Sequence, residues 1–185
     1  MSTFQDCIVS YLDLNDLGAL LATKSRRGVA VMRSLHQLVS SIAHTFAAHD
    51  EVCFWQDSVL LVAPVTAARD SYQRAMSDVE RLKQAIDGLN HCHCHAVSIK
   101  GQSFPAPTFP RARRRPRTIY LSASSLAFSN CFEVEHHLSH RKADWYLDCR
   151  ITSKIAHRQP DFSDPVILLP RNAKRDIHVF RGSFR

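Results

Sequence analysis

The stretch VCFWQDSVLLV, residues 52–62, consists of two apolar runs joined by Gln56 and Asp57. Runs rich in valine, leucine and aromatic residues on either side of a short polar break predict a β-hairpin, with Asp57 at its tip. A second apolar run, CIVSYLDL (7–14), predicts a strand with Asp13 near its end. An ionised carboxylate in a segment built to be buried is costly unless a cation or a hydrogen-bond partner compensates it. Asp13 and Asp57 therefore suggest a metal site. The alternative interpretation is that Asp13 caps a helix and Asp57 is simply a turn residue.

The elements around these two runs predict an α/β (α+β) fold. Apolar residues at three- and four-residue spacing predict one helix within 25–50 and another within 70–90. The full predicted order is strand, helix, strand, strand, helix, strand, strand, helix, strand. Its later strands are expected at 91–104, 118–122 and 143–151, with the third helix running to about His137. This order matches the ferredoxin-like split βαβ plan, a mixed sheet with helices packed on one face.

Length and composition indicate one compact domain in 185 residues, of which 45% are hydrophobic. We expect the domain to span residues 1–150, followed by a basic C-terminal extension, 151–185, that packs on the same domain or forms an add-on. Six cysteines spread through predicted elements fit reduced core residues better than a disulfide framework. With no apolar run long enough to span a bilayer, the sequence predicts a cytoplasmic protein without membrane contact.

The net charge of +7 is concentrated in two segments. RARRRPR (111–117) contributes +5 and residues 171–185 contribute +4, which leaves −2 for the rest of the chain. Such patches can bind phosphates or nucleic acid, but a short charge run is more often a solvated loop, and no interleaved aromatic residues favour nucleic acid here.

Four segments resemble the class III nucleotide cyclase domains, the adenylyl and guanylyl cyclase superfamily. They are YLDLNDLG after the first strand, the hairpin FWQDSVLL, the strand AVSIKGQSF and the helix ending CFEVE. In that family one aspartate after the first strand and another on the hairpin hold two divalent ions, Mg²⁺ or Mn²⁺, over a nucleoside triphosphate. The resemblance assigns these roles to Asp13 and Asp57, both as catalytic and as metal-binding residues. It also implies a homodimer, because family sites generally form between two subunits.

Three positions depart from the pattern of active family members. Cys53 stands where a lysine or glutamate commonly reads the base. Ser129 and Glu133 stand where an asparagine and an arginine stabilise the transition state. Glu133 reverses the useful charge. The loop residues Arg113, Arg114 and Arg115 are candidate substitutes that would bind the substrate's phosphates, and Lys100 is a further candidate phosphate contact.

The histidine-rich segments raise the question of zinc. In HCHCH (91–95), His91, His93 and His95 would share one strand face, where their side chains are splayed along the strand. No CxxC element supports a tetrahedral site, so the sequence does not favour zinc. EHHLSH (135–140) lacks the HExxH glutamate and fits a solvated helix end.

Two functions follow from these observations. The first is a metal-dependent nucleotide cyclase, a phosphorus-oxygen lyase that converts a nucleoside triphosphate to a cyclic nucleotide and pyrophosphate for signalling. The second is a catalytically inactive cyclase-like module that binds nucleotide, nucleic acid or a protein partner. The aspartate pair favours the first function, whereas Cys53 and Glu133 favour the second.

Overall fold

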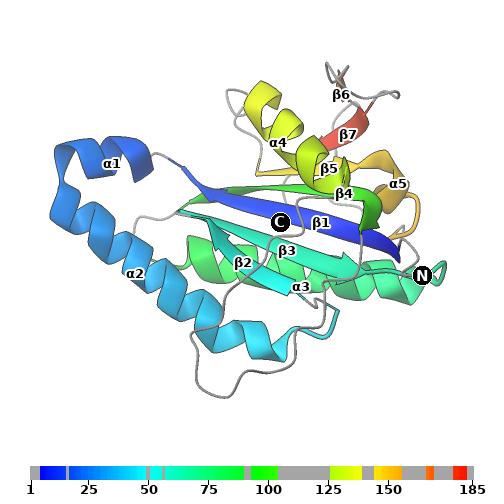
Figure 1. Ribbon diagram of the computed structural model, residues 1–185, viewed down its shortest axis with the longest axis horizontal. Helices are drawn as coiled ribbons and strands as arrows, with labels where there is room; N and C mark the ends of the chain where they lie inside the picture. The colour runs from blue at the N-terminus through cyan, green and yellow to red at the C-terminus, as the bar shows by residue number, and fades with distance from the viewer. Residues whose placement is uncertain are drawn as a thin grey trace.

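The computed structural model describes residues 5–15, 17–48, 51–55, 57–89, 93–103, 126–138, 144–155, 166–168 and 177–182. Its elements alternate along the chain much as the apolar patterns predict (Figure 1). They are β1 (Gln5–Leu14), α1 (Leu17–Thr23), α2 (Ser25–Ile42), a 3-10 turn (Ala43–Thr45), β2 (Glu51–Trp55), β3 (Ser58–Pro64), α3 (Arg69–Asp87), β4 (Cys94–Ser103), α4 (Leu126–Leu138), β5 (Trp145–Asp148), α5 (Cys149–Thr152), β6 (Val166–Leu168) and β7 (Ile177–Gly182).

The described strands form one mixed sheet of seven strands in the order β2-β3-β1-β4-β5-β7-β6. Strand β1 lies in its interior and is antiparallel to both β3 and β4, while β4 and β5 run parallel. The β2-β3-β1-β4 order, with helices between β1 and β2 and between β3 and β4, is the predicted ferredoxin-like split βαβ arrangement. The mixed α/β fold class is therefore confirmed. The strand predicted at 118–122 lies outside the described residues.

Helices cover both faces of the sheet, whereas the sequence predicted one face. Helices α2 and α3 pack on one face through amphipathic stripes, and the α3 stripe is the predicted one. It consists of Tyr72, Met76, Val79, Leu82 and Ile86, all buried. Helix α4 packs on the other face and buries Ala127, Cys131 and Val134 against the odd-numbered residues of β1 (Figure 1). Because successive strand residues face opposite sides, β1 supplies both cores and is buried on both faces.

The last strands extend the sheet beyond β5. The segment predicted as a strand over 143–151 instead stops at Asp148, whose buried side chain accepts a hydrogen bond from the Arg150 backbone N–H and caps α5. Strand β7 pairs antiparallel with β5, and β6 pairs with β7. Residues of the predicted C-terminal extension therefore lie in the same sheet as β1. No described helix is both long and apolar enough to cross a membrane.

Candidate functional site

The candidate site lies at the end of β1, where three neighbouring strands place polar residues in one row. Asp13 pairs with Ser58 of β3 on one side and with His95 of β4 on the other. Residues directly opposite one another on adjacent strands share a face. Asp13 lies two residues after Tyr11, which packs in the α4-side core, so the row faces α4.

Asp13 is held in position by two hydroxyl groups. The Ser58 hydroxyl donates a hydrogen bond to Oδ1 of Asp13, and the Tyr11 hydroxyl lies 3.3 Å from the same oxygen. The Tyr11 and Ser58 hydroxyls are themselves 2.7 Å apart. Asp13 therefore does not cap a helix: its side chain bonds within the sheet, and α1 begins only at Leu17.

Asp57 lies in the tight turn between β2 and β3, next in sequence to Ser58, as the hairpin pattern predicts. Burial raises the pKa of Asp13, and the nearby carboxylates of Asp57 and Glu135 raise it further, whereas the Ser58 hydrogen bond and His95 act in the opposite direction. The two predicted aspartates are therefore close enough to repel one another. This electrostatic cost is what a bound cation would remove.

We expect Asp13→Asn to raise the free energy of unfolding at pH 7, in the absence of divalent ions, by about 0.5–2 kcal/mol. A raised pKa in the folded state means that ionising Asp13 disfavours folding. That cost is absent below the ordinary carboxyl pKa of 3.8 and complete above the folded-state pKa. The advantage of the variant should therefore shrink as the pH falls. Urea unfolding of both proteins with EDTA across this pH range measures it, and equal stability at pH 7 would contradict the electrostatic account.

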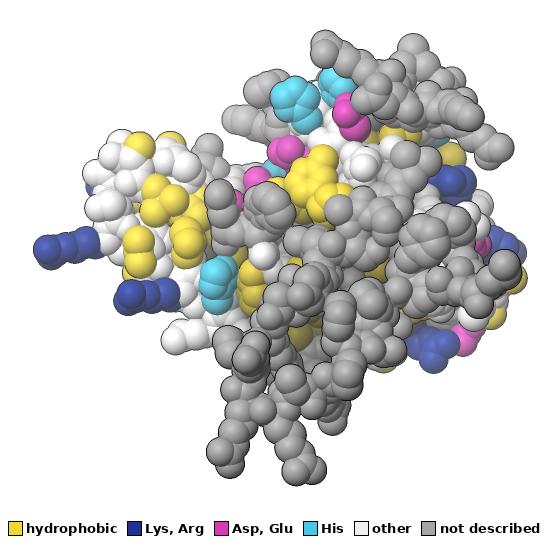
Figure 2. All heavy atoms as spheres, in the orientation of Figure 1, with side chains coloured by type: hydrophobic (Ala, Val, Ile, Leu, Met, Phe, Trp, Pro, Cys, Tyr) yellow, Lys and Arg dark blue, Asp and Glu magenta, His cyan; other side chains and the backbone are white. Residues whose placement is uncertain are grey.

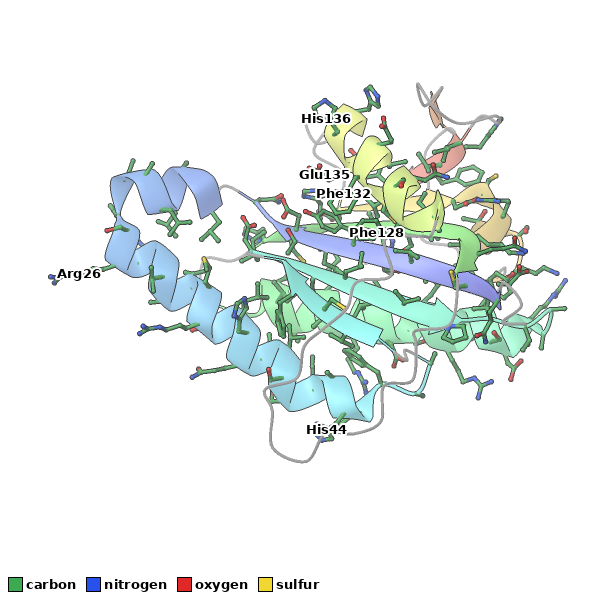
Figure 3. All side chains as sticks on the ribbon, viewed as in Figure 1. Arg26, His44, Phe128, Phe132, Glu135 and His136 are labelled. Atoms are coloured by element: carbon green, nitrogen blue, oxygen red, sulfur yellow. The ribbon has the colours of Figure 1, made fainter. Side chains whose placement is uncertain are left out.

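His95 and Glu135 join Asp13 in a cluster that the sequence analysis did not predict. One ligand-type atom from each of the three residues lies within 4.8 Å of the other two. Glu135 reaches the site from α4, on the same helical stripe as Phe128 and Phe132, whose rings pack on the α4-side core. In Figure 3, Glu135 lies over the end of β1 while His136 points away from the sheet. Acidic side chains gather beside a histidine between α1 and α4 in Figure 2.

Sequence signals for both residues existed but were weak. Strand alternation gives His95 one face of its strand, but only the register of β1 with β4 shows that Asp13 shares that face. Glu135 follows Phe128 and Phe132 at helical spacing, which predicts one shared face. What the sequence could not supply is the packing of α4 over β1, because that contact joins segments more than 100 residues apart.

The structure does not bring Lys100, a predicted phosphate contact, to this site. Lys100 pairs with Ile8, five residue pairs along β1 from the pair of Asp13 and His95, or roughly 16 Å at the usual rise per residue. Its ammonium lies 3.7 Å from a carboxylate oxygen of Asp6 and over the Tyr72 ring, on the α3 side of the sheet. Arg113, Arg114 and Arg115 lie outside the described residues, so their role stays a prediction.

The residues at the departing positions are also placed. Cys53 is buried in β2 on the α4 side of the sheet. Ser129 is exposed on α4, and Glu133 lies 3.5 Å from the Nε2 atom of His137 on the same helix. Glu133 therefore has a local contact of its own, and Glu135, two residues later, is the glutamate that reaches towards β1.

The donor set at the end of β1 suits a divalent cation. Oxygen ligands are those that Mg²⁺ and Mn²⁺ prefer, and the carboxylates of Asp13 and Asp57 supply them from adjacent segments. Burial first, and then the nearby carboxylates of Asp57 and Glu135, raise the pKa of Asp13 in spite of its hydrogen bond from Ser58. The residues present thus fit the metal that the two-aspartate arrangement implies.

The fold was compared with known proteins. No family model and no curated protein sequence matches the chain. Solved structures do match. The adenylyl cyclase CyaB from P. aeruginosa aligns at 12% identity over 99% of this chain and 96% of that one, with a TM-score of 0.67. The chain has the fold of the class III nucleotide cyclase domains. The guanylyl cyclase Cya2 aligns at 11% identity over 98% of this chain and 93% of that one, with a TM-score of 0.65.

A third similar structure contains a bound nucleotide. The guanylate cyclase domain of RhGC from Catenaria anguillulae, solved in complex with GTP, aligns at 13% identity. The alignment covers 98% of this chain and 97% of that one, with a TM-score of 0.60. The resemblance expected from four short sequence segments is therefore confirmed over nearly the whole cyclase-like fold. At such low identity the likeness establishes the fold alone.

Proposed function

We propose that this cyclase-like domain binds a nucleoside triphosphate together with two divalent ions, Mg²⁺ or Mn²⁺, and converts it to a cyclic nucleotide and pyrophosphate. The observation that carries the proposal is the convergence of Asp13 and Asp57 at one end of the sheet. Asp13 is oriented by Ser58 and Tyr11, and its pKa is raised by burial and further by the neighbouring Asp57 carboxylate. The fold shared with adenylyl and guanylyl cyclases supports the same assignment.

The proposed chemistry joins the ribose 3′-oxygen to the α-phosphorus and breaks the bond from that phosphorus to the oxygen of the departing pyrophosphate. Divalent ions in such a site make the 3′-hydroxyl easier to deprotonate and neutralise charge on the phosphates. The chain's own contribution is positioning. Asp13 and Asp57 hold the cations, while Ser58 and Tyr11 fix the Asp13 carboxylate before substrate arrives.

The proposed enzyme acts as a homodimer in which the partner subunit completes the site. Among the described residues, the titratable groups of other segments that act on the Asp13 carboxylate are Asp57, His95 and Glu135, and no lysine or arginine is among them. A triphosphate would need additional cations, and Arg113 to Arg115 are proposed to supply them. Size-exclusion chromatography with light scattering tests the dimer directly, and a monomer at all protein concentrations would remove this part of the proposal.

The second candidate is a cyclase-like module without turnover. Glu135 favours it, because a carboxylate beside Asp13 repels the anionic substrate. Such a module would still bind a nucleotide, nucleic acid through the basic loop, or a protein partner.

One experiment separates the two functions. The purified chain is incubated with Mn²⁺ and, in turn, ATP, GTP, CTP and UTP, and the products are separated by chromatography. The proposal predicts a cyclic nucleotide and an equal amount of pyrophosphate from at least one triphosphate. Metal-dependent binding of a fluorescent triphosphate without any cyclic product would instead establish the second candidate.

A further inference from the structure

His95 is a buried histidine with one ring nitrogen paired and the other unpaired. The residue is 91% buried, since its relative exposure is 9%. Its Nδ1 atom lies 2.8 Å from the side-chain oxygen of Asn15, an acceptor, so Nδ1 carries the proton. The other ring nitrogen, Nε2, is buried and has no hydrogen-bond partner among the described residues. A buried ring nitrogen left unpaired in this way is costly unless something occupies it.

The unpaired nitrogen lies beside the carboxylate of Glu135. Nε2 of His95 lies 3.7 Å from Oε1 of Glu135, too far for a hydrogen bond. Two ligands at zinc's usual bond length of about 2.1 Å and tetrahedral angle are about 3.4 Å apart. The His95 and Glu135 atoms are therefore near ligand spacing already. A carboxylate oxygen of Asp13 also lies within 4.8 Å of one ligand-type atom of each of these two residues, so the three side chains form one cluster.

The surrounding groups orient these ligands as they do in metal sites. A metal-binding histidine almost always donates its other N–H to a nearby acceptor, and Asn15 is that acceptor here. Ser58 and Tyr11 hydrogen-bond to the Asp13 carboxylate in the same supporting role. The three ligands come from different elements, β1, β4 and α4. The histidines of HCHCH alone would be splayed along one strand and could not surround an ion, but this limit does not apply to ligands from three elements.

We propose that Asp13, His95 and Glu135 bind one Zn²⁺ ion, with His95 contributing Nε2 and the fourth position left open. An imidazole nitrogen suits zinc and other transition metals, whereas Mg²⁺ takes oxygen ligands. One histidine with two carboxylates therefore selects a different ion from the one that suits Asp13 and Asp57. The zinc site shares Asp13 with the proposed nucleotide site but requires neither nucleotide nor turnover.

Zinc binding to the full chain tests this proposal without nucleotide. The protein is titrated with Zn²⁺ against a chromophoric zinc chelator, in buffer free of other divalent ions. We expect His95→Gln and Glu135→Gln each to weaken the binding of one Zn²⁺ per chain at least tenfold. His137→Gln is the matched control. The His137→Gln substitution also removes a histidine that contacts a glutamate of α4, but the His137 side chain is exposed. The variant should therefore bind Zn²⁺ with the affinity of the wild type.

Two further arms make the outcome decisive. In the wild-type protein, nitrogen NMR of the histidine rings should show one imidazole nitrogen shifting on zinc addition, a readout that needs no variant to fold. Asp57→Asn should keep zinc affinity within about threefold while losing any cyclase activity, which separates failure of the zinc site from failure of the proposed function. Absent zinc binding, equal affinity in His95→Gln, or loss of zinc binding in Asp57→Asn would each overturn the proposal.

Discussion

Asp57→Asn should reduce the rate of cyclic nucleotide formation at least about 100-fold while leaving the fold intact. Asparagine keeps the size of the side chain and one oxygen but removes the charge that would hold a cation. Metal ions contribute several kcal/mol of charge stabilisation in such reactions, and a factor of 100 corresponds to about 2.7 kcal/mol. Asp57 lies in a turn and its substitution buries no new group, so circular dichroism and the urea midpoint should stay close to those of the wild type.

A matched control exists on the other end of β1. Asp6 is an aspartate whose carboxylate lies 3.7 Å from the Lys100 ammonium. It is remote from Asp13 along β1, so its substitution removes one negative charge without touching the candidate site. Asp6→Asn should leave turnover within about twofold. Comparable losses in both variants would mean that overall charge, and not the position of Asp57, controls activity. Full activity in Asp57→Asn would remove Asp57 from the proposed mechanism.

Gly101→Val should destabilise the protein by about 1–3 kcal/mol and also displace the helix that carries Glu135. A Cβ atom at Gly101 of β4 would lie 2.4 Å from the Ala127 Cβ and 3.2 Å from the Ala127 backbone. Backbone cannot rotate away, so α4 must move or the strand must bend, and overpacking of this kind commonly costs that amount. Urea unfolding at constant pH measures the change.

Gly18→Ala in α1 is the control for the loss of a glycine. Nothing lies within 4 Å of a Cβ at Gly18, so alanine there should be neutral or stabilising by up to about 1 kcal/mol. If Gly101→Val lowered zinc affinity as well as stability, the packing of α4 on β4 would be what places Glu135 near Asp13. Wild-type stability in Gly101→Val would show that α4 is not packed closely on β4.

Local patterns were enough to predict the core of the fold. The continuous apolar runs of β1 and of the β2-β3 hairpin, and the stripe on α3, each specify an element whose burial the structure confirms. The place of α4 could not be predicted in this way. Its apolar positions give a helix but do not say which face of the sheet it covers, and the structure places it opposite α2 and α3.

The same distinction applies to the candidate site. Asp13 and Asp57 could be singled out because each carboxylate interrupts an apolar run, which is a local signal. His95 and Glu135 could not, because their proximity depends on strand register and on α4 packing across β1. Lys100 illustrates the converse: its sequence position near a strand end suggested a phosphate contact, yet register places it beside Asp6, far along the strand from Asp13.

Metal location in a crystal tests the central claim most directly. Crystals of the full chain grown with Mn²⁺ and a non-cyclisable nucleoside triphosphate analogue would be measured at a wavelength where manganese scatters anomalously. The account predicts manganese peaks within about 2.0–2.6 Å of carboxylate oxygens of both Asp13 and Asp57, with the triphosphate bound across them. Nucleotide bound with no manganese at Asp13 and Asp57, or manganese bound only elsewhere on the chain, would contradict it.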